Sequence, residues 1–323
     1  PRLAQSTGYI FLTLNGGSVE NKGMELSITG KPIVTKDFQW ETTLNLSGNR
    51  GRLGDFIDGV DIFYVTDAQV GAAKAGSIPN GGYFLGLTGN KYETAQGPDG
   101  KMYNVIDPST GLYKDTQVET NIVGNREPKL IGGFNNSFSY KNFNLSFLFD
   151  IRLGGDIYNG TEYYLVTKGL STKTINRESV SFTGVVNTGT AAKPSYETKT
   201  ITYNANETYQ VGNSTRSGKY MIQEYYKNYA KNAYNFITDT NWLRLRSISL
   251  SYDFKDLLKK QNIIKGLTAT ITGTNLFVWT NYKGMDPETC VSGSGTGGSG
   301  SAGIDYCGVP ATAGMSFGIN LTF

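Results

Sequence analysis

The chain has no histidine among its 323 residues. Serine and cysteine hydrolases use an imidazole as general base, and most zinc sites use one as a ligand, so this absence argues against both. No pair of carboxylates stands out, and no Gly-rich stretch is followed by the Lys-Ser or Lys-Thr pair of a phosphate-binding loop. The sequence therefore predicts a protein that is not an enzyme, with no catalytic residues, no cofactor and no metal site.

Long apolar runs are also missing. No stretch of about 18 apolar residues occurs, which excludes a transmembrane helix. A strand of a membrane barrel needs only about 9 to 11 residues of alternating polarity, so a mean hydropathy of -0.32 is compatible with such a protein. The 30 Lys and Arg residues and 27 Asp and Glu residues are scattered, with no basic stripe that would indicate nucleic-acid binding.

The residues that are abundant favour β-structure. The chain contains 41 Gly and 21 Tyr, and only 18% of its residues are charged. The strongest alternation lies at the C-terminus, where polar residues separate five apolar ones, which are Met315, Phe317, Ile319, Leu321 and Phe323. A membrane-spanning strand and the last strand of a soluble sandwich would share this pattern.

Six further segments alternate in the same way. They are residues 24–29, 38–47, 134–140, 143–153, 242–254 and 267–279. Turn residues separate the first pair at Lys31-Pro32 and Thr35-Lys36, and the second pair at Lys141-Asn142, which predicts two hairpins. In 242–254 the apolar side changes near Ser247, which indicates a bulge or an exit from the bilayer.

The connections between these segments alternate between short and long. Roughly 80 residues separate Gly51 from Leu130, roughly 88 separate Gly154 from Asn241, and roughly 34 separate Asn281 from Gly314, whereas the other links are short. Short periplasmic turns and long extracellular loops are typical of outer-membrane barrels. The predicted fold is all-β: the C-terminal part of a transmembrane antiparallel β-barrel, with about seven strands here and the others upstream.

Two features of the long loops are candidate functional elements. Cys290 and Cys307 flank a Gly/Ser-rich tip at 293–301, which we expect to be a flexible loop tip. If this loop is extracellular, a disulfide contributing about 3 kcal/mol is favoured over two free thiols. Aromatic residues gather in the second long loop, among them Tyr225, Tyr226, Tyr229 and Tyr234. These rings could stack on sugars, and the alternative is an aromatic girdle or packing between loops.

Four separated blocks resemble one family. They are Asn15–Leu26, Val123–Lys129 (VGNREPK), Asp239–Leu250 (DTNWLRLRSISL), and Gly273–Phe277 (GTNLF) with Lys283–Glu288 (KGMDPE). In this order they resemble the C-terminal barrel region of SusC/RagA-type TonB-dependent transporters. The segment between Gly111 and Val123 departs from the family, because it lacks an Asp/Asn-Gly-rich stretch that many members carry there.

The resemblance implies a barrel of about 22 strands in the outer membrane of Bacteroidetes, of which residues 1–323 are the C-terminal portion. It implies an N-terminal plug before Pro1, which TonB pulls, and a SusD-like surface lipoprotein as lid. Such transporters import oligosaccharides or peptides across the outer-membrane lipid. The terminal strand resembles the signal that the barrel-assembly machinery recognises, so we expect deletion of Phe323 to impair assembly.

Two other functions remain open at this point. A structural or adhesive outer-membrane barrel would share every strand feature and would have no plug domain upstream. A secreted β-rich protein, such as a carbohydrate-binding module, would need no membrane and would partition without detergent.

Overall fold

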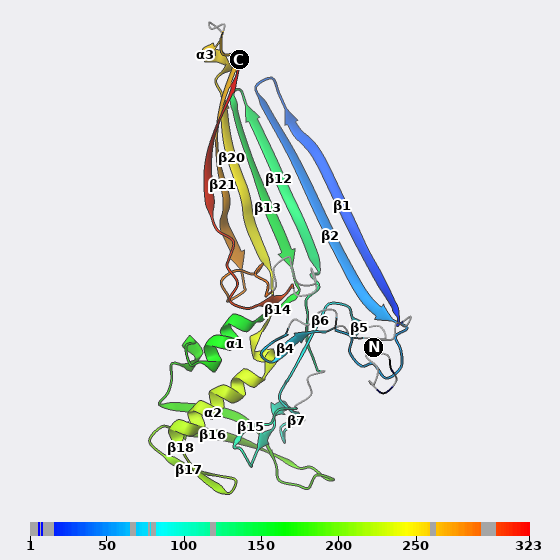
Figure 1. The fold of residues 1–323 in the computed structure, drawn as a ribbon, viewed down its shortest axis with the longest axis vertical. Coiled ribbons are helices and arrows are strands. Elements are labelled where there is room, and N and C mark those ends of the chain that lie inside the picture. Colours follow the sequence, from blue (N-terminus) through cyan, green and yellow to red (C-terminus); the bar gives the residue numbers. More distant parts are fainter. Residues whose placement is uncertain are drawn as a thin grey trace.

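Seven long strands form one antiparallel sheet in the computed structural model, which describes residues 6, 8, 16–64, 69–76, 78, 82–116, 121–258, 263–291 and 302–323 (Figure 1). Their order in the sheet is their order in the chain, and the seven predicted strands are confirmed. They are β1 (Ser18–Val34), β2 (Phe38–Gly54), β12 (Leu130–Tyr140), β13 (Phe143–Leu153), β20 (Trp242–Asp253), β21 (Gly266–Thr280) and β23 (Gly314–Thr322). A two-residue strand, β5 (Gly82–Tyr83), adds to the end of β2.

Short turns connect the strands at one end of the sheet. The first turn is tighter than predicted, because β1 continues through an irregularity between Gly30 and Ile33 and ends at Val34. The second turn is at Lys141, as predicted, and its φ of 54° supplies the left-handed conformation that a tight hairpin needs. The short helix α3 (Lys255–Leu258) lies at this same end (Figure 1).

The register gives the sheet one apolar and one polar face. One row of paired residues crosses all seven strands and is almost entirely large and apolar: Ile33, Trp40, Phe138, Leu145, Leu250, Ile271 and Phe317. The neighbouring row on the other face is polar: Glu41, Ser137, Ser146, Ser249, Thr272 and Ser316. Asn136 is a buried polar residue on the apolar face, and its side-chain Oδ1 accepts a hydrogen bond from the Trp40 indole N–H at 3.0 Å.

A bulge explains the change of phase in β20. Leu148 pairs with Ser247 and Phe149 pairs with Leu245, so Arg246 is the extra residue. The facing strand β21 is irregular at the same level, where Asn275 has a φ of 51°. The inserted residue keeps Leu243 and Leu245 on the apolar face and leaves both arginines of β20 on the polar face. The bulge near Ser247 is therefore confirmed.

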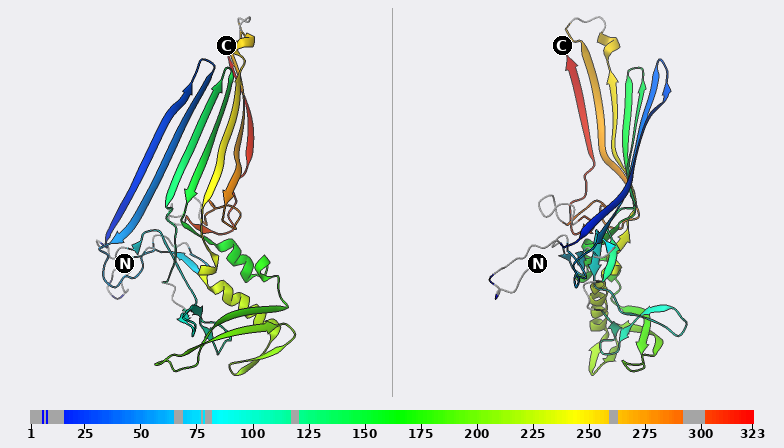
Figure 2. Two further views of the ribbon diagram at one scale, coloured as in Figure 1. Left: turned by 180° about the vertical axis from the view of Figure 1, so that it is seen from behind. Right: turned by 90° about the vertical axis from the view of Figure 1, so that its right-hand side faces the viewer.

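The three long connections lie together at the other end of the sheet, as all views show (Figures 1 and 2). We call the described parts of residues 69–125, 154–241 and 281–314 the loop body. Its helices are α1 (Gly160–Thr167) and α2 (Gly218–Lys231), with 3₁₀ turns at Thr172–Thr174 and Ala233–Phe236. No helix among the described residues has the length and apolar character to cross a membrane.

Short strands make up the rest of the loop body. From the first connection come β3 (Gln69–Val70), β4 (Ala73–Ala75), β6 (Gly86–Gly89), β7 (Thr94–Gln96), β8 (Met102–Asn104), β9 (Ile106–Asp107), β10 (Leu112–Tyr113) and β11 (Ile122–Asn125). From the second come β14 (Asp156–Asn159), β15 (Ser179–Asn187), β16 (Tyr196–Asn204), β17 (Thr208–Val211), β18 (Ser214–Ser217) and β19 (Ile237–Asp239). The third contributes β22 (Ile304–Asp305).

The loop body has hydrophobic cores of its own. One core joins all three connections, with Leu87 from the first, Tyr158 and Phe236 from the second, and Ile304 from the third. A second core packs Ile106 and Leu112 against β15, β16 and α2. The long connections, predicted only as long loops, are thus folded and packed together. The predicted flexible tip at 293–301 lies outside the described residues.

Helix α2 shows how the sequence directs this packing. Its N-cap Ser217 accepts a hydrogen bond from the amide of Tyr220, and it ends before Asn232, which caps the following 3₁₀ turn. Apolar residues at helical spacing place Met221 and Ile222 in the second core, while Lys219 and Lys227 lie on the exposed side.

Candidate functional site

The polar face of the sheet contains a hollow of about 760 Å³ next to the loop body. Its lining crosses from β1 to β20 and mixes polar side chains, among them Glu25, Asn45, Asp150, Arg246 and Glu288, with apolar ones, which are Leu26, Leu46, Ile131, Leu148, Ile151 and Trp242. Gly133 has no side chain to occupy this face, and a Cβ there would come within 3.9 Å of the Asp150 carboxylate. A hollow with this mixed lining can take up a ligand that has polar and apolar parts, but among the described residues it offers no nucleophile with an adjacent base.

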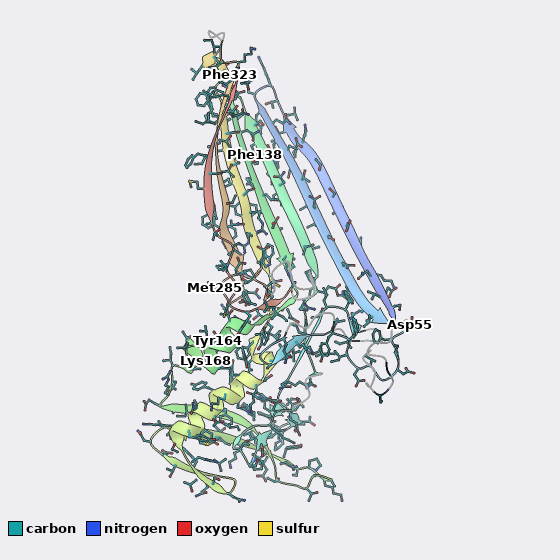
Figure 3. All side chains as sticks on the ribbon, viewed as in Figure 1. Asp55, Phe138, Tyr164, Lys168, Met285 and Phe323 are labelled. Atoms are coloured by element: carbon teal, nitrogen blue, oxygen red, sulfur yellow. The ribbon has the colours of Figure 1, made fainter. Side chains whose placement is uncertain are left out.

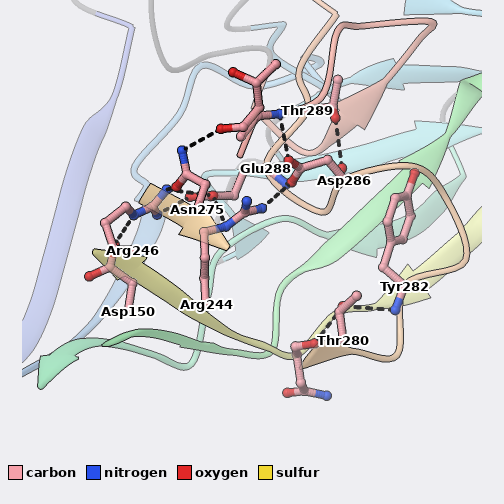
Figure 4. Close-up of polar contacts among 12 residues, drawn as sticks. Asp150, Arg244, Arg246, Asn275, Thr280, Tyr282, Asp286, Glu288 and Thr289 are labelled. Atoms are coloured by element: carbon pink, nitrogen blue, oxygen red, sulfur yellow. Dashed lines mark hydrogen bonds and ion pairs between the residues drawn. The ribbon is translucent and has the colours of Figure 1, made fainter. Parts of the chain in front are cut away.

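An ion cluster forms one wall of the hollow (Figure 4). The bulged Arg246 donates from Nε to Asp150 Oδ2 at 2.6 Å and from Nη2 to Glu288 Oε1 at 2.9 Å. Its Nη1 also donates to Glu288 Oε2 at 3.2 Å, so this arginine holds the glutamate with two nitrogens. The planar guanidinium is suited to such paired contacts, and the cluster joins β13, β20 and the third connection.

Arg244 lies deeper in the same cluster. Its Nη2 donates to Asp286 Oδ1 at 2.6 Å, and these two side chains are only 3% and 5% exposed. The other oxygen of Asp286 accepts the amide of Ala311 at 2.9 Å, and Glu288 Oε2 lies 2.7 Å from Arg244 Nε. Removing one partner of a buried ion pair costs about 3 to 5 kcal/mol because the other charge is left unpaired. The cluster therefore fastens both sides of the third connection to the sheet.

A second polar contact connects the third connection to α1. The Tyr282 hydroxyl donates to Asp305 Oδ2 at 2.7 Å, and the Thr161 hydroxyl donates to Asp305 Oδ1 at 3.1 Å. Burial raises the pKa of Asp305 above its usual value, although both hydrogen bonds act in the opposite direction. Burial and the hydrogen bond to Asp305 also raise the pKa of Tyr282. Both groups serve to position the loop body, since neither has a reactive neighbour in the described residues.

The predicted terminal residues occupy the apolar face of β23 and the position after it. Met315, Phe317 and Ile319 are 65%, 76% and 73% exposed, and Leu321 and Phe323 are exposed as well. Phe323 follows the last residue of β23, Thr322, and lies at the end of the sheet where the short turns are (Figure 3). An exposed apolar face on an edge strand is stabilised when lipid or another apolar protein surface covers it.

The two cysteines lie in the third connection without a bond between them in the structure. Cys290 is half-buried, and Cys307 is exposed with its amide donating to Thr161 Oγ1 at 2.6 Å. The disulfide stays a prediction for the oxidised protein.

The four tyrosines predicted as candidate substrate contacts in the second connection do not form one surface. Tyr225 stacks on Phe182 with ring centroids 5.2 Å apart, and Tyr229 packs edge-on against Phe236 at 5.7 Å, in the other core. The Tyr226 hydroxyl donates to Asn176 O at 2.8 Å, and Tyr234 is 64% exposed. Packing against the two cores accounts for Tyr225, Tyr226 and Tyr229, and contact with substrate stays a prediction.

The residues of the ion cluster were not predicted as a site. The available signal was Arg244 and Arg246 on one side of a strand, because charges in such a segment need partners. The acidic residues in KGMDPE, Asp286 and Glu288, are those partners, about 40 residues later in the chain. Among the described residues, no group of three or more Cys, Asp and Glu could hold a metal ion.

Comparison with curated proteins gives matches along nearly the whole chain. The TonB-dependent receptor P3 of Formosa agariphila is 25% identical over 326 residues, which cover 96% of this chain and 29% of that receptor. The TonB-dependent receptor SusC of Bacteroides thetaiotaomicron is 26% identical over 318 residues, covering 97% and 27%. The predicted resemblance is confirmed. The chain resembles SusC-type TonB-dependent receptors and spans under a third of the length of these two relatives.

Solved structures show the same fold. The RagAB peptide importer in its closed-closed state matches with a TM-score of 0.59 and 20% identity, over 99% of this chain and 31% of that one. The open-open state gives a TM-score of 0.56 and 19% identity. No protein-family model matches the chain. The antiparallel sheet with its loop body is therefore a segment of a fold seen in RagAB, and the SusC/RagA-like blocks of the sequence include every residue of the ion cluster except Asp150.

Proposed function

We propose that the chain is the C-terminal portion of an outer-membrane TonB-dependent transporter that imports oligosaccharides or peptides. The observation that carries this proposal is the pattern of the sheet, in which a row of large apolar residues crosses all seven strands and the neighbouring row on the other face is polar, while apolar residues such as Phe317 and Ile319 stay exposed. Water would oppose such a surface, whereas hydrocarbon would stabilise it. The relatives named as receptors support import over an adhesive role.

The further parts of this proposal concern segments and partners beyond the chain. We infer that β1 pairs with upstream strands of a barrel of about 22, and that a plug domain pulled by TonB fills the lumen. A SusD-like lipoprotein would cover the loop body at the cell surface. The similarity to the RagAB peptide importer supports peptides as one cargo class.

We further propose that β23 and Phe323 form the signal for the barrel-assembly machinery. Phe323 contributes little to the pairing of the sheet, since it follows the last paired residue and is 70% exposed. Deleting Phe323 should lower the amount of receptor in the outer membrane, whereas Phe323→Tyr, which keeps a terminal ring, should not. Equal membrane levels of both variants and the wild type would refute the signal.

Uptake in the native organism tests the transport function. Deletion of the full-length gene and depletion of TonB should each abolish growth on the same oligosaccharide or peptide. Growth that is lost on gene deletion but persists without TonB would contradict a TonB-dependent importer. Unchanged growth on all nutrients, combined with loss of surface attachment, would favour the adhesive barrel.

A further inference from the structure

A cleft of about 490 Å³ lies within the second connection, away from the sheet. One wall is a face of α2, the second is the end of α1 with Lys168 and Gly169, and the third is the segment Thr174–Glu178 that leads into β15. Lys168 is labelled beside α1 in Figure 3. The cleft is separate from the ion cluster, with which it shares no lining residue.

The α2 wall presents residues at the spacing of one helix face. They are Lys219, Ile222, Gln223, Tyr226 and Lys227. Ile222 is buried, together with Val166 of α1, so the floor of the cleft is apolar. The two lysines stand eight residues apart at its two ends, and a rise of 1.5 Å per residue separates their Cα atoms by about 12 Å along the axis.

The charge of the lining is strongly unbalanced. Four of its residues are cationic, namely Lys168, Arg177, Lys219 and Lys227, and one is acidic, Glu178. The whole chain is nearly balanced, with 30 basic and 27 acidic residues. Gathering like charges around one cleft is unfavourable without a counter-charge. All four cations are exposed, so water screens part of this repulsion, and an anion in the cleft would relieve the rest.

Most of these cations are available for a ligand. Lys227 pairs with Glu224 at 2.7 Å, and Arg177 donates to the Gly169 carbonyl at 3.0 Å. Lys168 lies over the ring of Tyr164, 5.5 Å from its centroid. Within the described part of the chain, no ion pair involves Lys168, Arg177 or Lys219. Three cations thus face the cleft without an acidic partner there.

We propose that this cleft binds a short linear oligomer that carries carboxylate or sulfate groups, with its neutral part over Ile222 and Tyr226 and its acidic groups at Lys219 and at Lys227, whose solvent-exposed pair with Glu224 is weak enough to be exchanged for the ligand. A span of about 12 Å fits about four extended peptide residues, and an acidic oligosaccharide offers the same chemistry. The proposal rests on the proposed import function, because it assigns the selectivity for cargo to the loop body.

Binding by the full-length receptor in detergent tests the site without requiring transport. The probes are tetraglutamate and an oligogalacturonate, with tetraglutamine and maltotetraose as neutral counterparts. Calorimetry should show binding of at least one acidic probe, weakened when ionic strength rises from about 0.1 M to 1 M, and no comparable binding of the neutral probes. The acidic probe that binds shows whether the ligand of the cleft is an acidic peptide or an acidic oligosaccharide.

A triple variant examines the cations themselves. Lys168→Gln, Lys219→Gln and Lys227→Gln together should weaken binding of the acidic probe by about tenfold or more. The matched control is Lys193→Gln, Lys199→Gln and Lys231→Gln together, three exposed lysines that do not line the cleft, and it should bind as the wild type does. Unchanged circular dichroism of the triple variant would show that the fold is intact.

The outcomes separate this inference from the transport proposal. Equal binding of acidic and neutral probes, no binding of either acidic probe, or unchanged affinity of a folded triple variant would each overturn the anion site. None of these results would touch TonB-dependent uptake. Conversely, specific acidic binding with growth that does not depend on TonB would leave the site standing and refute the import function.

Discussion

The sheet and the loop body place their apolar residues in opposite ways. In the loop body, Leu87, Tyr158 and Ile304 are completely buried at 0% exposure, as in a protein folded in water. In the sheet, Phe317 and Ile319 are 76% and 73% exposed, although both are large and apolar. The loop body therefore buries its apolar side chains, whereas the sheet exposes them. The ion cluster lies where these two regions meet.

Disrupting the ion cluster between the sheet and the loop body should have the largest effect on stability. Asp286→Ala leaves Arg244 buried with only Glu288 near it, and we expect a loss of about 3 to 5 kcal/mol in the free energy of unfolding. Urea unfolding in lipid vesicles measures this loss. The control is Glu20→Ala, whose pair with Lys22 is more than half exposed on both sides and should contribute under about 1 kcal/mol. Equal losses of stability for both variants would contradict a stabilising role for the buried pair of Arg244 and Asp286.

Truncating the same residue type in both regions contrasts the two packing modes. Leu87→Ala opens a cavity in the loop body and should cost about 2 to 5 kcal/mol. Leu321→Ala on the apolar face of β23 should cost less, because lipid can fill the space that the side chain leaves. Unfolding of both variants in the same vesicles gives the comparison, and a larger loss for Leu321→Ala would reverse it.

Adding a charge to each face in turn tests which face contacts lipid and which contacts water. Leu145→Arg places a guanidinium on the apolar face and should destabilise the protein by about 2 to 4 kcal/mol in a bilayer. Ser146→Arg, the next residue, places it on the polar face and should have little effect. If the two variants unfold at the same urea concentration, the sheet does not distinguish its faces.

The smallest effect concerns pH and the loop body alone. Burial raises the pKa of Asp305 in the folded protein, so the folded state binds this proton more tightly than the unfolded state. Stability from this group is fully present below its unfolded pKa of about 3.9 and is lost as pH rises through the folded pKa. Asp305→Asn should therefore flatten the decline of stability between these two values. An unchanged pH profile would show that Asp305 does not contribute.

The sequence was sufficient for the sheet and insufficient for the loop body. Period-two alternation predicted all seven strands, and the shifted phase of Leu243 and Leu245 indicated a bulge or an exit from the bilayer near Ser247, because both are local patterns; the register then identified Arg246 as the extra residue. The loop body depends on contacts between segments far apart in the chain, such as Leu87 with Tyr158 and Ile304, for which no local pattern exists. The pairing of Arg244 with Asp286 was missed for the same reason.

The central claim is that one face of the sheet contacts hydrocarbon. Nitroxide labels at single cysteines from 143 to 153, in a full-length receptor with Cys290 and Cys307 replaced by serine, test it most directly in lipid vesicles. The account predicts collisions with oxygen at the odd positions, including Leu145 and Phe147, and collisions with a water-soluble nickel complex at the even positions, including Asn144 and Ser146. Equal access of the nickel complex to both sets would contradict it.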